Sequence, residues 1–400
     1  MVNLQTMAKT SCCLPFQHLG THPNGSVSVC CQADMSNPNS FARTNGQMLF
    51  LGKNTLDEIR NSESFKQVRL NMLAGQEPSQ CHRCYETERS GGRSKRQLEN
   101  HLYNWKEDDA FTYVDGSIDS PLQFIELRLG NTCNLACITC NSVSSSKWSK
   151  DEQFLTKKIE WFKAFENSKQ TRWFESEGFY ENLAAISKHV QKIYINGGEP
   201  LLIKQHKVLL QKLIDMGVAK NIHIEYSINL TIKDEEFIAL WSQFKYVSVQ
   251  FSIDATYEMN DYIRYGSNFA DIQNNLEWYI ANKPHNVYYF VCQTISALNA
   301  CQIEQMQGFL EEYKLQMYVN PVYSPEYFSA SALTEAEKIK VRKSIAPLKD
   351  DQIKSTMIAW LDNNKSDSNM RDKLNQVINA LNETRDIQYP KYLGDIVISK

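Results

Sequence analysis

Three cysteines stand close together in the stretch Cys133-Asn-Leu-Ala-Cys137-Ile-Thr-Cys140, directly after a run that alternates apolar and polar residues. Three thiolates within eight residues can hold one iron–sulfur cluster from a single loop. Because three ligands rather than four leave one iron open, such a cluster could also bind a small molecule. Two other interpretations remain open: a zinc site whose fourth ligand lies elsewhere in the chain, and three cysteines that bind no metal.

A second group of cysteines lies in the first hundred residues, as the pairs Cys12-Cys13, Cys30-Cys31 and Cys81-x-x-Cys84. Four of these thiolates could ligate a cluster completely, and they could equally hold a structural zinc ion. The chain begins without an apolar run that resembles a secretory signal, so a cytoplasmic protein is expected. In that compartment cysteines seldom form a disulfide framework, and an odd total of 11 cannot all pair.

The elements that must position these cysteines follow from the hydrophobic pattern. Six strands alternate with helices between residues 122 and 325, which predicts a parallel sheet with right-handed crossovers that could close partly into a barrel. The expected strands are 123–129, 192–196, 223–229, 246–254, 286–296 and 316–322, and the expected helices are 147–168, 178–189, 204–216, 233–243, 269–281 and 302–313. Outside this region we expect a hairpin turn at Pro23-Asn24-Gly25, a helix over 55–74 that ends at Gly75, and two or three helices within 334–382.

Several of the expected strands are apolar on one face and polar on the other. In the strand over 246–254, for example, Val247 and Val249 alternate with Ser248 and Gln250. A parallel strand that is buried on both faces should be apolar on both. The pattern therefore predicts that the apolar faces meet the helices and the polar faces line a cavity; the alternative is an open sheet with one solvated face.

The cysteine loop after the first strand resembles that of the radical S-adenosylmethionine (SAM) superfamily. The second strand ends in Ile195-Asn196-Gly197-Gly198-Glu199-Pro200, which is similar to the GGE motif that holds the SAM amino group in that family. One position departs from the family pattern, because Thr139 stands where many members place an aromatic residue against adenine. The resemblance implies SAM contacts at Gly197, Gly198, Glu199, Ser227, Asn229, Ser252, Asp254 and Arg264, and cluster ligands at Cys133, Cys137 and Cys140.

This resemblance also implies a fold, a reaction and partners. The fold would be a partial (β/α)6 barrel of the radical SAM type. The open iron of a [4Fe–4S] cluster would bind SAM, and an electron from a low-potential donor such as flavodoxin or ferredoxin would release a 5′-deoxyadenosyl radical that takes hydrogen from the substrate. Cys292 could return hydrogen to a substrate radical, or it could be a buried packing residue.

The N-terminal cysteines resemble those of a twitch module, the shorter relative of the SPASM domain, which binds an auxiliary [4Fe–4S] cluster. Its C-x-x-P and G-x-V-x-x-C spacings favour Cys12 and Cys30 as ligands beside Cys81 and Cys84, with Cys13 and Cys31 as substitutes. The last cysteine pair is followed by Glu88, Ser94 and Arg96, which could brace the segment that carries Cys81 and Cys84. Related enzymes place the module after the barrel, whereas here it comes first.

We therefore expect an auxiliary cluster module over residues 1–120, a radical SAM barrel over 121–330 and a helical extension over 331–400. The preferred function is an oxidoreductase or modifying enzyme that acts on a peptide or protein side chain. The alternatives are a dehydrogenase or epimerase of a small molecule and a noncatalytic iron–sulfur protein. A net charge of −3 favours no nucleic-acid partner, and no apolar stretch predicts a membrane span.

Overall fold

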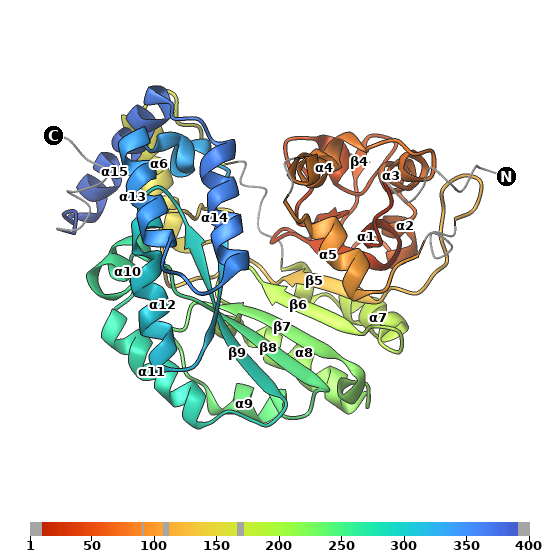
Figure 1. The fold of residues 1–400 in the computed structure, drawn as a ribbon. Helices are drawn as coiled ribbons and strands as arrows, with labels where there is room; N and C mark the ends of the chain where they lie inside the picture. Colours follow the sequence, from red (N-terminus) through yellow and green to blue (C-terminus); the bar gives the residue numbers. More distant parts are fainter. Residues whose placement is uncertain (1–9, 90–91, 107–111, 166–171, 391–400) are drawn as a thin grey trace.

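A sheet of eight strands forms the centre of the computed structural model, which describes residues 10–89, 92–106, 112–165 and 172–390 (Figure 1). The strand order is β10-β9-β8-β7-β6-β5-β1-β2, and the pairs from β5 to β10 are all parallel. These six strands are β5 (Phe124–Arg128), β6 (Lys192–Asn196), β7 (His223–Ile228), β8 (Tyr246–Ser252), β9 (Val287–Ile295) and β10 (Gln316–Pro321). The predicted partial barrel of six βα units is thus confirmed.

Helices follow the strands and cover the apolar face of the sheet, as the alternating pattern predicted. They are α6 (Ser149–Lys158), α7 (Glu177–Ile186), α8 (Lys204–Asp215), α9 (Glu235–Trp241), α11 (Phe269–Ala281) and α12 (Ile303–Glu312). A short helix α10 (Tyr257–Ile263) was not predicted. The helix expected over 147–168 is too long, because Ile159 is extended and packs with Phe162 into the core; residues 166–168 lie outside the described residues.

The N-terminal part is joined to the barrel through the sheet. The predicted hairpin is confirmed, since β1 (His18–Thr21) pairs antiparallel with β2 (Val27–Ser28). Strand β1 also pairs parallel with β5, which the sequence did not indicate, so the hairpin extends the barrel sheet by two strands. A short helix α1 (Leu14–Gln17) precedes β1.

Four further helices complete this part of the chain: α2 (Leu56–Arg60), α3 (Glu63–Leu73), α4 (His82–Arg89) and α5 (Lys95–Leu102). The single helix predicted over 55–74 is wrong, because Ser62 has an extended ψ of 150° that separates α2 from α3. Gly75 does follow the second of these helices with a φ of +72°, as a helix end of this kind requires.

The C-terminal part consists of the helices α13 (Glu335–Ile345), α14 (Asp351–Asn363) and α15 (Ser368–Arg385). Helix α15 packs against α6, and α14 lies beside β10 at its carboxyl end (Figure 1). The indole of Trp360 in α14 donates a hydrogen bond of 2.9 Å to the carbonyl of Val322. No helix in the described part of the chain combines the length and the apolar character needed to cross a membrane.

Candidate functional site

The three-cysteine loop follows β5, and its backbone is held from the outer side. The amide of Ala136 donates to the carbonyl of Tyr265 at 2.9 Å, and the indole of Trp148 donates to the carbonyl of Cys137 at 2.6 Å. Because an amide and a carbonyl of the loop are bound by these neighbours, the loop can keep its three thiols on the opposite side. Burial raises the pKa of Cys137 to about 11 and that of Cys140 to about 12.

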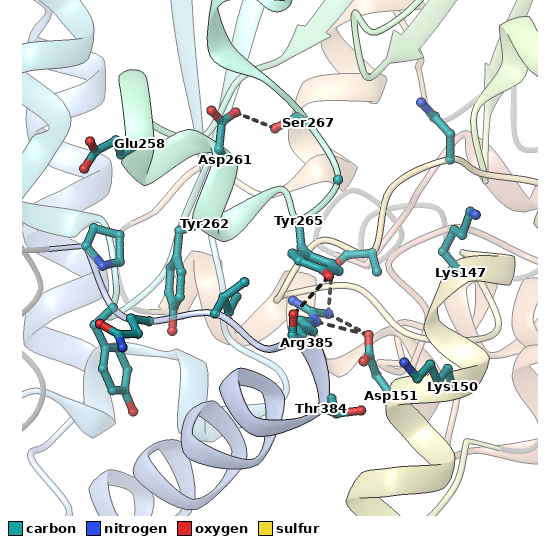
Figure 2. A pocket seen from close by; sticks show the side chains of 17 residues that line it. Lys147, Lys150, Asp151, Glu258, Asp261, Tyr262, Tyr265, Ser267, Thr384 and Arg385 are labelled. Carbon is teal, nitrogen blue, oxygen red and sulfur yellow. Dashed lines mark hydrogen bonds and ion pairs between the residues drawn. The ribbon is translucent and has the colours of Figure 1, made fainter.

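The side chain of Arg385, at the end of α15, also binds the cysteine loop from this outer side. Its Nη2 donates to the carbonyl of Ala136 at 2.7 Å and to Asp151 at 2.9 Å, and its guanidinium lies 4.5 Å from the ring centroid of Tyr265. Figure 2 shows Arg385, Asp151 and Tyr265 at a cavity of about 850 Å³, which is distinct from the larger cavity described below. Sequence reasoning missed Arg385, because a contact across 249 residues leaves no spacing signal.

The Gly197-Gly198 turn packs directly against the cysteine loop. Both glycines have a positive φ, +82° and +57°, which residues with a side chain rarely adopt. A Cβ atom on Gly198 would lie only 2.3 Å from the carbonyl oxygen of Thr132, and the next amide, that of Glu199, donates to the same oxygen at 2.7 Å. The turn therefore requires glycine for conformation and for space, and it fixes the two predicted motifs against each other.

Glu199 itself is turned away from the site. Its buried carboxylate accepts hydrogen bonds from the amide of Leu201 at 3.1 Å and from the amide of Asn229 at 2.6 Å, and burial raises its pKa to about 7. In this position the carboxylate holds the end of β7 beside the glycine turn. Its contact with the amino group of SAM stays a prediction.

Asp254 and Arg264 form a buried ion pair of 2.9 Å at the end of β8. Asp254 also accepts a hydrogen bond from the amide of Thr294 at 2.9 Å. Burial alone would lower the pKa of Arg264, but the neighbouring Cys137 and Asp254 raise it. The Nε of Arg264 is buried and has no hydrogen-bond partner among the described residues. An unpartnered, charged donor at this point is suited to a carboxylate ligand.

One cavity of about 1220 Å³ brings most of the predicted residues together. Glu199 and Cys292 are not among the residues that line it, whereas Thr294, on the same face of β9 as Cys292, is. Burial raises the pKa of Cys292 to about 12, and its role in hydrogen return stays a prediction. The predicted residues that do line the cavity are Cys84, Cys133, Cys137, Cys140, Gly197, Gly198, Ser227, Asn229, Ser252, Asp254 and Arg264.

The N-terminal cysteines come together from three separate segments. Burial raises the pKa of Cys81, and the neighbouring Cys12 and Cys84 raise it further. Cys12 also raises the pKa of Cys30 and of Cys84. Cys12 thus acts electrostatically on each of the other three predicted ligands, and their joint ligation of one cluster stays a prediction. The adjacent Cys31 has a lowered pKa, first because of its hydrogen bond with Cys30 and then because Lys95 lies close.

An ion pair between Arg96 and Glu88 supports helix α4, which carries Cys84. The guanidinium of Arg96 binds the carboxylate of Glu88 through two nitrogens, with Nε at 3.0 Å, and Ser94 donates to the same carboxylate. Nη1 of Arg96 donates to the carbonyl of Ser11 at 2.7 Å, one residue before Cys12. The predicted brace from Glu88, Ser94 and Arg96 is therefore confirmed.

Single metal ions are a separate question. Within residues 10–390, the masked gaps aside, no three His, Cys, Asp or Glu side chains converge as they do around one metal ion. The donor sets consist of thiols, which suit both iron–sulfur clusters and zinc. The choice between these two therefore depends on comparison with known proteins.

Two family models match the chain. Residues 127–296 match the radical SAM superfamily, and residues 12–85 match an iron–sulfur cluster-binding domain, SPASM, so the predicted resemblance is confirmed for both parts. No curated protein matches the chain significantly.

Solved structures are similar at low identity. Native anSMEcpe with bound AdoMet and a Cp18Cys peptide is 16% identical with a TM-score of 0.39, over 57% of this chain and 59% of that one. Streptococcus suis SuiB bound to S-adenosylmethionine is 13% identical with a TM-score of 0.37, over 70% of this chain and 62% of that one. The chain thus spans less than two thirds of the length of either protein.

Proposed function

We propose that the chain is a radical SAM enzyme, as the match of residues 127–296 indicates, and that it uses SAM to start a radical reaction on a side chain of a peptide or protein. The cofactors of the matched domains are a [4Fe–4S] cluster with SAM and an auxiliary iron–sulfur cluster. The observation that carries the proposal is the cavity whose lining brings together the three-cysteine loop, the glycine turn and Arg264.

The cysteine loop fits the SAM-binding cluster. Cys133, Cys137 and Cys140 line the cavity, while the backbone between them is bound from behind. Cys133, Cys137 and Cys140 would hold the cluster, which would bind SAM and supply the chemistry of its reductive cleavage, with hydrogen abstraction from the substrate. The protein's part in this chemistry is to bind, to orient and to exclude water.

Two sets of residues would orient SAM. Arg264, fixed by its ion pair with Asp254, presents a charged donor to a carboxylate. The side chain of Asn229 donates to Asn134 of the cysteine loop at 2.8 Å and lies 3.9 Å from the sulfur of Cys133, which ties the end of β7 to the loop. We also propose the division of labour expected above: residues 1–120 hold the auxiliary cluster, 121–330 hold SAM, and 331–400 complete the substrate cavity.

A polypeptide substrate is supported by the size and lining of the cavity. At about 1220 Å³ the cavity exceeds the roughly 300–1,000 Å³ of ordinary small-molecule sites, so space remains beside SAM. Amide and hydroxyl groups line the part away from the cysteine loop, among them Asn320, Gln352, Thr356 and Asn363. Such groups can pair with the backbone of an extended peptide segment.

SAM cleavage tests the proposal directly. The protein is reconstituted anaerobically with iron and sulfide, given SAM and dithionite, and assayed for 5′-deoxyadenosine. We expect cleavage by the wild type, none by a variant with Cys133, Cys137 and Cys140 replaced by Ala, and wild-type cleavage by Cys301→Ala, a cysteine that does not line the cavity. An iron-loaded wild type that cleaves no SAM would support the noncatalytic alternative.

A further inference from the structure

The two walls of the large cavity differ in charge. The N-terminal wall consists of one face of α4 and the start of α5, where Arg83, Arg93 and Lys95 line the cavity with one acidic residue, Glu86. The opposite wall is one face of α14, and it contributes no charged side chain to the lining among the described residues. This face consists of Gln352, Ser355, Thr356, Ala359 and Asn363.

The cations in this wall fall into two classes. Lys95 pairs with Glu99 at 3.0 Å, and Arg128 in the floor pairs with Glu126 at 2.9 Å; both carboxylates are buried behind the cavity. These two pairs are electrically balanced. Lys95 and Arg128 are among the residues that line the cavity, whereas neither carboxylate is.

Arg83 and Arg93 form the second class. Both are exposed, and within the described ranges no carboxylate forms a salt bridge with either of them. A guanidinium without a partner presents a fork of donors that matches a carboxylate in two parallel hydrogen bonds. A ligand that enters between α4 and α14 therefore meets Arg83 and Arg93, which form no salt bridge, together with the single carboxylate of Glu86 on one side, and uncharged side chains on the other.

We propose that the polypeptide substrate carries acidic residues beside the residue that reacts, and that Arg83 and Arg93 bind their carboxylates. The backbone of the same segment lies against the amides of α14. This inference rests on the proposed function, because it names the substrate class of that same cavity. A basic segment would face repulsion from the N-terminal wall, so the arrangement selects by attraction and by exclusion.

A competing explanation assigns these arginines to the auxiliary cluster. Arg83 precedes Cys84, and a positive charge beside a cluster offsets the negative charge of its thiolates. In that case, removal of the arginines would change the reduction potential of the auxiliary cluster and leave peptide binding unchanged. The two explanations therefore predict different readouts for the same variants.

The test uses two labelled probes, fluorescein-hexaglutamate and fluorescein-hexalysine, with anaerobically reconstituted full-length protein and SAM. By fluorescence anisotropy we expect hexaglutamate to bind at least about tenfold more tightly than hexalysine. The variant Arg83→Ala with Arg93→Ala should lose most of this preference. The matched control is Arg89→Ala, because Arg89 lies on the same helix but pairs with Glu77 at 2.8 Å and does not line the cavity.

Each other result overturns the inference. Equal binding of the two probes, or unchanged hexaglutamate binding in the double variant, excludes an acidic-peptide site. Full displacement of hexaglutamate by inorganic phosphate at matched ionic strength assigns the arginines to small anions instead. SAM cleavage is measured in all variants without peptide. A failure of the proposed function would appear as loss of SAM cleavage, whereas a failure of this inference would appear only in the relative binding of hexaglutamate and hexalysine.

Discussion

The two cysteine sites of this protein are built in opposite ways. The predicted barrel site takes all three thiols from eight consecutive residues on one loop, whereas the predicted ligands of the N-terminal site, Cys12, Cys30, Cys81 and Cys84, come from three segments. A local site depends on how its loop is held, and a non-local site depends on the fold of the whole module. We therefore expect the barrel site to be sensitive to the loss of distant residues that hold its loop, and the N-terminal site to be sensitive to the loss of its own ligands.

The residues that support the two sites also differ in how far along the chain they lie from the cysteines. The barrel loop is bound by Arg385, which comes from the far end of the chain. The N-terminal site is braced by Glu88 and Arg96, which lie within the same module. Both supports are buried ion pairs, whose loss leaves an uncompensated charge.

Removal of ligands gives the largest expected effect and separates the two sites. Replacing Cys81 and Cys84 by Ala should remove the auxiliary cluster and about half of the iron, yet leave reductive SAM cleavage, because the open iron belongs to the barrel loop. Iron analysis, EPR spectroscopy and the 5′-deoxyadenosine assay measure this outcome.

Circular dichroism is the necessary control for this variant, because metal binding and folding are coupled in small cysteine modules. A soluble, folded Cys81/Cys84 variant with full iron content would show that the N-terminal cluster is wrong. Zinc in the N-terminal half of the wild type would favour the zinc-ribbon alternative.

Loss of the remote support should harm the barrel site selectively. Arg385→Ala leaves Asp151 buried without its partner, which should cost about 3–5 kcal/mol of unfolding free energy and loosen the cysteine loop. Urea denaturation gives the stability, and EPR should show loss of the barrel cluster with the auxiliary cluster retained.

Lys158→Ala is the matched control for this prediction. The ion pair between Lys158 and Glu383 joins the same two helices, α6 and α15, but both side chains are about half exposed, at 52% and 54%. An exposed pair of this kind contributes about 0–1 kcal/mol. Equal effects of Arg385→Ala and Lys158→Ala would contradict the proposed support.

Protonation of His206, which follows the glycine turn in α8, should lower the stability of the folded chain in acid, whereas Glu199, whose pKa is raised to about 7, should act in the opposite direction. The Nδ1 of His206 donates to the carbonyl of Pro200 at 3.1 Å and its Nε2 accepts from Tyr226 at 2.8 Å; burial lowers the pKa of His206 from 6.5 to about 4. Between these values the unfolded chain binds a proton that the folded chain does not, so stability falls as the pH falls. The loss from this group should reach about 3 kcal/mol at pH 4.

Unfolding free energies of the wild type and His206→Gln from pH 7.5 to 4 check this slope. The pKa values of His18 and His223 are also lowered to about 4, mainly by burial, so the variant should retain part of the acid sensitivity. Parallel curves for the two proteins would exclude His206 as a source of the pH dependence.

Much of the fold was predictable, because hydrophobic alternation and strand spacing are local signals. The six barrel strands, the cysteine loop and the glycine turn all follow from short stretches of sequence. The pairing of β1 with β5, the role of Arg385 and the hydrogen bond from the amide of Asn229 to Glu199 did not follow, because each depends on packing between distant segments. The break at Ser62 was missed because helix propensity alone does not reveal that a second helix starts there.

The smallest expected effect concerns the choice between adjacent cysteines in the N-terminal site. Cys31→Ala should leave the auxiliary cluster and change stability by less than about 0.5 kcal/mol, since the G-x-V-x-x-C spacing favours Cys30 as the ligand and Cys31 is only half-buried. Cys30→Ala should abolish the cluster. The same contrast is expected between Cys13→Ala and Cys12→Ala, which iron content and EPR would measure. If Cys31→Ala lost the cluster and Cys30→Ala retained it, the ligand would be Cys31, and the module would hold its cluster on the side that faces the barrel.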